Sequence, residues 1–399
     1  MSKASLLVSL LLSGCLYTAH AAGNPIADER QSRKLQVPQF RVQPFWPKPL
    51  PQIRGADGQL RRWVSGEVGG ICVDSHDHII TVNRGWQNGP DGGLHFAEAM
   101  AGTPAPPVVI FDVEGNVVGS WGDASLVSSQ GASKVMPDSL HDCFVDEENN
   151  IWIAGSNDGI VQKYTHDGRL LLQIGTKGVC DGPPTLSPQA FFPTCGSPGY
   201  NRSTTLLNSP SDIWVDPAPD PVARQPGSVY IADGYGNHRV VVFDSAGRYL
   251  RQWGTAGDGP DQFAVIGGGH PHCIATAHDG AVYVCDRGHN RILVFDKMGV
   301  LHGSIPVNPV GGLAAPARAN DIRFSDDPQQ SFLYVADGGN AVVEILSRAT
   351  GAIVGVIGSG PGHQAGQFVA PHQLAVDSEG NVYVAEVAGG RRVQKFVKQ

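Results

Sequence analysis

Charged residues are scarce in this sequence: Asp, Glu, Lys and Arg make up 17% of its 399 residues, and the net charge is −8. No basic patch stands out, and this acidic balance argues against a nucleic-acid ligand, which requires clustered Lys and Arg. Beyond the first residues, no apolar run is long enough to cross a bilayer as a helix. Glycine is instead abundant, at 51 residues. Because glycine supplies the positive φ angles of tight turns, the composition predicts many short strands joined by turns.

Residues 1–21 are typical of an export signal. A lysine precedes the apolar stretch Ala4–Leu12, which is too short for a membrane span. Two processing sites fit this segment. The triplet Ala19–Ala21 favours cleavage after Ala21, whereas a lipobox-like sequence ending at Cys15 would place a lipid anchor there. Both predict an exported protein, periplasmic or extracellular, in which residues 22–38 form a linker.

Six cysteines remain after Cys15. Cys180 and Cys195 lie in one Gly/Pro-rich insertion, Val179–Pro198, and in an oxidising compartment they are candidates for a disulfide. The other four sit inside apolar, strand-like runs, and we interpret them as small buried hydrophobic residues. These four are Cys72, Cys143, Cys273 and Cys285.

A pattern of four short apolar runs, separated by turn residues, repeats along the chain. It is clearest in residues 211–254. Each unit has roughly 40–60 residues, the size of a four-stranded propeller blade. The six copies begin at Gly70, Asp142, Ser211, Ile274, Asp321 and Gln373.

The segment Val229–Phe243 resembles the pattern of the NHL repeat family, and the resemblance covers roughly residues 64–399. It implies an all-β fold, a six-bladed β-propeller of four-stranded NHL-type blades over residues 39–399. The sixth copy stops after its third strand, near Phe396. We therefore expect a strand from the N-terminal segment, within Gln39–Phe45, to complete this blade and close the ring, which leaves only short, protected sheet edges.

One position of the repeat, the residue just before the inner strand of each blade, is rich in histidine. The six residues at this position are called the column below. Alternate blades of a six-bladed ring lie about a third of a turn apart, so three histidines in alternate blades would meet on the axis. Three imidazoles with a fourth position open are typical of a zinc site, although copper, nickel and iron accept the same ligands. The residue before each inner strand is, in chain order, Gly69, His141, Ser211, His272, Asn320 and His372.

The turn after the second strand of each blade lies on the histidine face. This turn carries Arg84 in the first blade, Tyr235 in the third and Arg287 in the fourth. Two long insertions, Gly85–Pro107 and Thr176–Asn208, open on the same face and are expected to form a lid or pocket wall. Salt bridges between blades are the alternative role for the two arginines, and packing within the turn is the alternative for the tyrosine.

The sequence around these positions resembles the peptidyl-α-hydroxyglycine α-amidating lyase family. The resemblance implies zinc held by His141, His272 and His372, with Tyr235 as the catalytic base. It also implies that Arg84 is catalytic and that Arg287 binds substrate. The matching segments are Val82–Gly85, Leu140–Asp142, Ala232–Asn237, Pro271–His272, Asp286–Arg287 and Pro371–His372.

The family cleaves the N–C bond of an α-hydroxyglycine-type carbinolamide, giving an amide and glyoxylate. The resemblance therefore implies a small-molecule or peptide substrate, and we expect a monomer. The family often has an acidic residue after the last histidine that serves a structural calcium. Here this residue is Gln373, which speaks against calcium.

Two other functions stay open from the sequence. The first is a non-catalytic NHL propeller that binds protein or glycan. The second is a calcium-dependent, lactonase-like hydrolase. Calcium prefers oxygen ligands, and among the six column residues only Asn320 supplies one, which argues against the hydrolase.

Overall fold

Short strands make up almost all of the regular structure. The computed structural model describes residues 36–55, 57–84, 101–122, 135–182, 195, 199–265, 270–307 and 319–399. Within these residues it contains seven sheets, and six of them have four antiparallel strands each. Residues Val37–Gln399 form one compact unit. The all-β class predicted from the sequence is confirmed.

The six four-stranded sheets are numbered here in chain order. Sheet 1 holds β4 (Val68–Val73), β5 (Ile79–Asn83), β7 (Val108–Phe111) and β8 (Val117–Trp121). Sheet 2 holds β9 (Leu140–Val145), β10 (Ile151–Gly155), β11 (Ile160–Tyr164) and β12 (Leu170–Gly175). Sheet 3 holds β13 (Asp212–Asp216), β14 (Ser228–Asp233), β15 (Arg239–Phe243) and β16 (Tyr249–Trp253). Sheet 4 holds β17 (Ile274–Thr276), β18 (Val282–Asp286), β19 (Arg291–Phe295) and β20 (Leu301–Pro306). Sheet 5 holds β21 (Ala319–Phe324), β22 (Phe332–Asp337), β23 (Val342–Ser347) and β24 (Ile353–Ile357). Sheet 6 holds β25 (Pro371–Val376), β26 (Val382–Glu386), β27 (Val393–Lys398) and β1 (Phe40–Gln43).

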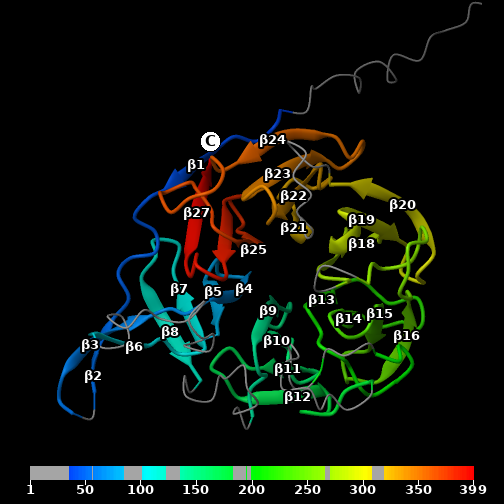
Figure 1. Cartoon of the computed structure of the whole chain (residues 1–399), viewed down its shortest axis with the longest axis horizontal. Helices are drawn as coiled ribbons and strands as arrows, with labels where there is room; N and C mark the ends of the chain where they lie inside the picture. The colour runs from blue at the N-terminus through cyan, green and yellow to red at the C-terminus, as the bar shows by residue number, and fades with distance from the viewer. Residues whose placement is uncertain are drawn as a thin grey trace, which may run out of the picture. The chain divides into compact units, whose positions relative to one another are not determined.

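The first strand of each sheet contacts the first strands of both neighbouring sheets. These contacts join β4 to β9, β9 to β13, β13 to β17, β17 to β21, β21 to β25, and β25 back to β4. Figure 1 shows the six sheets around a common centre, with β4, β9, β13, β21 and β25 nearest to it. The arrangement is consistent with a β-propeller.

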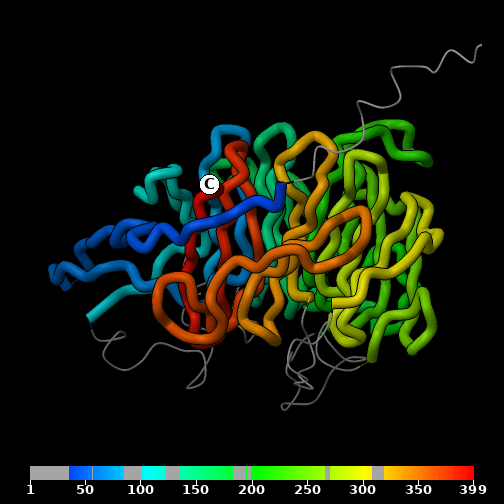
Figure 2. The backbone as a smooth tube through the Cα atoms, turned by 90° about the horizontal axis from the view of Figure 1, so that it is seen from above, coloured from blue at the N-terminus to red at the C-terminus, as the bar shows by residue number. Residues whose placement is uncertain are grey.

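Two segments from the N-terminal region lie on the outside of this arrangement. Strand β1 pairs antiparallel with β27, with Phe40 opposite Lys398 and Gln43 opposite Lys395. Figure 2 shows this segment running beside the C-terminal strand. The seventh sheet lies outside the ring in Figure 1 and contains β2 (Gln52–Arg54), β3 (Leu60–Val64) and β6 (Gly102–Pro104).

The hydrophobic core is divided among the junctions between sheets. Six buried apolar clusters each lie between two neighbouring sheets, including one between sheet 6 and sheet 1 that contains Ile79 and Tyr383. The second strand of every sheet is buried along its whole length. Both faces of each sheet are therefore covered, which explains the continuous apolar runs in the sequence.

Some of the abundant glycine is required where sheets approach each other. Gly168 and Gly299 precede the outer strands of sheets 2 and 4, with φ angles of +92° and +85°. A Cβ at Gly168 would lie 2.6 Å from the ring of Trp121, and one at Gly299 would lie 2.6 Å from Trp253. Only glycine satisfies both the left-handed backbone and the close approach of the preceding sheet.

The structure contains three disulfides among the described residues. Cys180 is bonded to Cys195 within the insertion, the pair identified from the sequence. Disulfides are typical of oxidising compartments and indicate an exported protein. In the described part of the chain, no helix has the length and apolar character needed to span a membrane. The export signal, residues 1–21, lies outside the described residues, as does the candidate lipid site Cys15.

The interpretation of four cysteines as unbridged buried residues is wrong. Cys72 is bonded to Cys143, and Cys273 to Cys285. The first bond joins β4 to β9, inner strands of different sheets whose cysteines are 71 residues apart in sequence. The second joins residues that face each other across the start of sheet 4, where the Cys285 amide donates to the Cys273 carbonyl. Neither juxtaposition is visible when each apolar run is considered alone.

Candidate metal centre

Three histidines converge at the centre of the ring. His141 and His372 are the second residues of β9 and β25, and His272 lies two residues before β17. All three are buried, with at most 4% of each exposed. Their ring centroids are 4.7 to 5.1 Å apart, and one nitrogen from each lies within 4.8 Å of the others. The structure therefore brings together the three residues that the repeat analysis selected.

Each histidine is held in one tautomer by a backbone carbonyl of the next sheet. Since a carbonyl oxygen only accepts, each Nδ1 must carry a hydrogen, and a neutral imidazole then presents an Nε2 lone pair. The Nδ1 partners are the column residues that are not histidine. They are Ser211 for His141 (2.6 Å), Asn320 for His272 (2.6 Å) and Gly69 for His372 (2.8 Å).

A second set of contacts fixes the backbone just before each histidine. Side chains from sheets 1, 3 and 5 donate to the carbonyl of the residue that precedes the histidine in the next sheet. The donors are Arg84 Nε to Leu140 (2.8 Å), Ser211 Oγ to Pro271 (2.9 Å) and Asn320 Nδ2 to Pro371 (2.8 Å). The histidine sites are thus supported in an approximately threefold-symmetric way.

The histidine layer has the chemistry of a metal-binding set. Burial lowers the pKa of each imidazole well below its ordinary value, and the positive charge of nearby arginines contributes to this. Neutral imidazole is the form that binds metals. The Tyr235 hydroxyl lies 2.7 Å from Nε2 of His141 and 3.0 Å from Nε2 of His272. One phenolic proton cannot satisfy two lone pairs, so a cation fits the arrangement better than the hydroxyl alone.

Tyr235 reaches the histidines from an unusual backbone position. It follows β14 and has a φ of +62°, a left-handed conformation that costs a residue other than glycine roughly 1–2 kcal/mol. Its neighbours Gly234 and Gly236 leave no room for a side chain, because a Cβ would lie 1.9 Å from the Pro271 carbonyl or 2.2 Å from Asn208. Strain of this kind is concentrated at functional sites.

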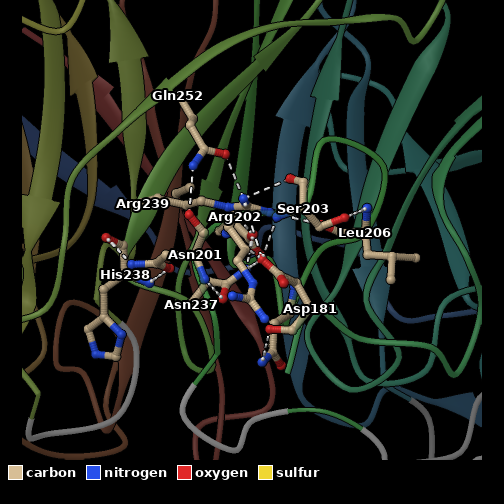
Figure 3. Close-up of polar contacts among 12 residues, drawn as sticks. Asp181, Asn201, Arg202, Ser203, Leu206, Asn237, His238, Arg239 and Gln252 are labelled. Atoms are coloured by element: carbon tan, nitrogen blue, oxygen red, sulfur yellow. Dashed lines mark hydrogen bonds and ion pairs between the residues drawn. The ribbon is translucent and has the colours of Figure 1, made fainter. Parts of the chain in front are cut away.

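A polar network joins Asn237 and Arg239, which follow the turn that contains Tyr235, to Asp181 and Ser203 of the insertion (Figure 3). Arg239 is fully buried; its Nε donates to Asp233 (2.9 Å), and its other nitrogens donate to the carbonyls of Ser203 and Leu206 (2.8 Å each). Asp181 in turn accepts the backbone N–H of Ser203 at 3.0 Å. Residues 183–194 and 196–198 of this insertion, and residues 85–100 of the other, lie outside the described residues, so their role as a lid stays a prediction.

The two arginines lie on the same face as Tyr235 but have different partners. The guanidinium carbon of Arg287 is 5.5 Å from the centroid of the Tyr235 ring, and its Nη1 donates to the Asn320 side chain at 3.3 Å. Arg84 forms an ion pair with Glu67, with Nη1 to Oε2 at 2.8 Å. Glu67 belongs to none of the motifs recognised in the sequence. It is marked there only by its place two residues before Gly69, the column residue of sheet 1.

In sheets 2, 3 and 5 the residue directly after the column position is a buried aspartate. Asp142, Asp212 and Asp321 are each fully buried, and Arg323 donates to Asp321 at 2.6 Å. Burial raises the pKa of all three carboxyl groups, that of Asp321 to about 8. These carboxylates follow the column position, so the histidine pattern of the repeat does not mark them.

The carboxylate layer supports the histidines rather than offering an open cation site. Asp212 accepts the amide of Ile274 and Asp321 that of Leu374, each at 2.7 Å and each two residues after a histidine. Asp212, Cys273 and Asp321 are close enough to hold a metal ion. However, Cys273 is in a disulfide, and Arg323 already supplies positive charge to the carboxylates.

Residues 269–295 match the NHL repeat family. The chain is 29% identical to human NHL repeat-containing protein 3 over 343 residues, which cover 80% of this chain and 84% of that protein. It is 24% identical to peptidyl-alpha-hydroxyglycine alpha-amidating lyase 1 of Drosophila melanogaster over 355 residues, 83% of this chain and 57% of that protein. A solved streptogramin B lyase shares the fold, with a TM-score of 0.50 and 12% identity over 90% of this chain and 98% of that one. The chain thus resembles NHL-repeat propellers and the amidating lyases.

Proposed function

We propose that this chain is an exported, metal-dependent lyase that cleaves the N–C bond of an α-hydroxyglycine-type carbinolamide. The products are an amide and glyoxylate or a related aldehyde. The observation that carries the proposal is the buried trio of His141, His272 and His372, whose Nε2 side is contacted by the Tyr235 hydroxyl. The similarity to amidating lyases over 83% of the chain supports the same chemistry.

The proposed scaffold is a six-bladed β-propeller over residues 39–399, with each of the six four-stranded sheets as one blade. The continuous contacts from β4 round to β25 support six blades in a closed ring. The pairing of β1 with β27 supports closure by the N-terminal strand. Residues 1–21 are proposed as the export signal, with or without a lipid on Cys15, and residues 22–38 as a linker.

His141, His272 and His372 would hold the metal through Nε2, and we propose zinc, with other transition metals as alternatives. When bound, such an ion acts as a Lewis acid that lowers the pKa of a substrate hydroxyl. The carbonyls of Ser211, Asn320 and Gly69 keep the three imidazoles in the ligand tautomer.

Tyr235 is proposed as the base, because its hydroxyl is at the open side of the histidine trio. In its phenolate form it accepts the proton of the substrate hydroxyl, the electron pair left on oxygen forms the aldehyde C=O bond, and the C–N bond breaks. The Tyr235 phenol then returns this proton to the leaving amide nitrogen, so the reaction is balanced without an oxidant. Arg287, beside the Tyr235 ring, is proposed to bind the substrate carboxylate. Arg84 is proposed to act beside the substrate, as in the family it resembles, and also holds the carbonyl before His141.

A non-catalytic NHL propeller that binds protein or glycan is the second candidate. The 29% identity to human NHL repeat-containing protein 3, over most of both chains, favours it. The two candidates differ in whether the channel histidines matter for function. The calcium-dependent hydrolase is disfavoured, because Arg323 supplies the positive charge among the channel carboxylates.

Metal content and product release together test the proposal. Purified mature protein is expected to contain about one transition-metal ion in the channel, which is lost in His141→Ala, His272→Ala and His372→Ala. Protein with its metal should release glyoxylate from α-hydroxyhippurate. Metal-containing protein that never releases glyoxylate would contradict the lyase assignment. Retention of the channel metal in all three variants would show that these histidines do not hold it.

A further inference from the structure

A second group of histidines lies at the other end of sheet 1. The turn between β4 and β5 contains Asp74, His76 and His78, and the turn between β11 and β12 of sheet 2 contributes His166. Gly69, which contacts His372, lies at the start of β4, and Asp74 follows the end of this strand, five residues later. At ~3.3 Å per residue, the two ends of this strand are roughly 17 Å apart. The group is therefore separate from the channel histidines.

Asp74 organises this group through both of its carboxylate oxygens. Oδ1 accepts the backbone N–H groups of His76 (2.8 Å) and His78 (2.9 Å). Oδ2 lies 2.9 Å from Nδ1 of His78 and 2.9 Å from Nε2 of His166. Ligand atoms of Asp74, His76 and His78 all lie within 4.8 Å of one another. One carboxylate thus faces imidazole nitrogens from two different sheets.

The turn is rigid and its imidazoles are accessible. Asn149 of sheet 2 accepts the Ser75 amide (3.0 Å) and donates to the Ser75 hydroxyl (2.8 Å), which holds the turn between Asp74 and His76. The Asp74 side chain is 1% exposed, whereas those of His78 and His166 are 34% and 38% exposed. A metal ion could therefore reach the imidazoles from solvent while the carboxylate stays in place.

The same turn in other sheets has different chemistry. In sheet 2 the equivalent carboxylate, Asp146, is 2.9 Å from the Lys163 ammonium group and accepts the Trp152 indole N–H. In sheet 6 the equivalent Asp377 accepts the Asn381 amide and the Tyr383 hydroxyl. The repeat supplies the carboxylate in each case, but only the sheet 1 turn among these three surrounds it with imidazoles.

We propose that Asp74, His76 and His78, with His166 beside them, form a second metal site for a divalent transition-metal ion such as Zn²⁺ or Cu²⁺. Imidazoles together with one carboxylate are the ligand set that these ions prefer. The three ligands come from one turn of sheet 1, and His166 of sheet 2 contacts the same Asp74 carboxylate, so the site lies where neighbouring sheets meet. The site does not depend on the proposed lyase reaction.

Zn²⁺ binding to the metal-depleted full-length protein tests this site. Wild type is expected to bind about two equivalents in equilibrium dialysis, and His76→Ala/His78→Ala to bind about one. The matched control, His278→Ala/His302→Ala, removes two exposed histidines outside the group and should keep both equivalents. A His76→Ala/His78→Ala variant that binds as much Zn²⁺ as wild type overturns the proposal.

A spectroscopic readout distinguishes the two sites within wild type and His76→Ala/His78→Ala. Cu²⁺ added to wild type should give an electron paramagnetic resonance signal with nitrogen hyperfine structure from two sites, one of which disappears in His76→Ala/His78→Ala. Zn²⁺ should also raise the Tm of wild type more than that of this variant, since ligand bound only to the native state stabilises it. Identical spectra and Tm shifts for the two proteins contradict the site.

Discussion

His141 donates its Nδ1 proton to the carbonyl oxygen of Ser211, 2.6 Å away in the neighbouring sheet. Ser211 occupies the same position in sheet 3 that His141 occupies in sheet 2. The relationship recurs from His272 to Asn320 and from His372 to Gly69. One position of the repeat thus has two alternating roles. In three sheets it supplies an imidazole, and in the other three it supplies the carbonyl that orients that imidazole.

Tyr235→Phe tests the proposed base. Removing the hydroxyl is expected to lower kcat by about 10²- to 10⁴-fold, the usual contribution of a general base, while the channel metal content stays unchanged. Steady-state glyoxylate release and metal analysis of the same preparations measure both. Tyr249→Phe, which removes a hydroxyl on the outer strand of sheet 3, should behave as wild type. Full activity in Tyr235→Phe would exclude the tyrosine as the base.

Ser211→Ala tests the orientation of the histidines from the neighbouring sheet. The change removes the Oγ contact to the carbonyl before His272 but keeps the backbone carbonyl that accepts from His141. Because such supporting contacts typically contribute 10- to 100-fold in metal affinity, we expect the channel site to bind its metal about 10-fold more weakly. Competition with a chromophoric chelator measures the affinity, and kcat at saturating metal should change much less. Ser304→Ala, in the outer strand β20, is the control. Equal metal affinities for the two variants would mean that the Ser211 hydroxyl does not help to orient the histidines.

The sequence predicted the parts of the site that the repeat itself encodes. Aligning the inner strands selected His141, His272 and His372 because a repeat turns equal positions into equal places in space. The turn residue Tyr235 followed from strand direction in the same way. Strand β1 was expected within Gln39–Phe45 because the sixth copy lacked its outer strand.

The features missed from the sequence depend on contacts between sheets. The bond from Cys72 to Cys143 joins two strands that become neighbours only when the ring forms. The pairing of Arg84 with Glu67 depends on the register of β4 against β5, in which Val68 lies opposite Asn83. The buried carboxylates are visible in the sequence, but their role depends on Arg323, which the fold places beside Asp321.

Removal of the bond between Cys72 and Cys143 is expected to destabilise the protein more than removal of the bond between Cys180 and Cys195. The two bonds span 71 and 15 residues, and a bond that closes a longer loop removes more conformational entropy from the unfolded chain. Loop-closure entropy alone predicts a difference of about 1.4 kcal/mol. Denaturant unfolding of Cys72→Ala/Cys143→Ala and Cys180→Ala/Cys195→Ala compares them directly. A larger loss for the second variant would mean that the insertion contributes more to stability than chain entropy predicts.

The stability of the metal-free protein is expected to fall as pH decreases below about 6.5, the ordinary pKa of histidine. Burial lowers the pKa of His141, His272 and His372 in the folded state, so protons bind first to the unfolded chain. Above pH 6.5 these imidazoles are neutral in both states and add no pH dependence. Below it, each contributes a loss of up to about 1.4 kcal/mol per pH unit until its folded pKa is reached. Denaturant unfolding at several pH values should show a shallower dependence for His272→Asn than for wild type. Parallel curves for the two proteins would mean that His272 has the same pKa in the folded and unfolded states, which contradicts the lowering of its pKa by burial.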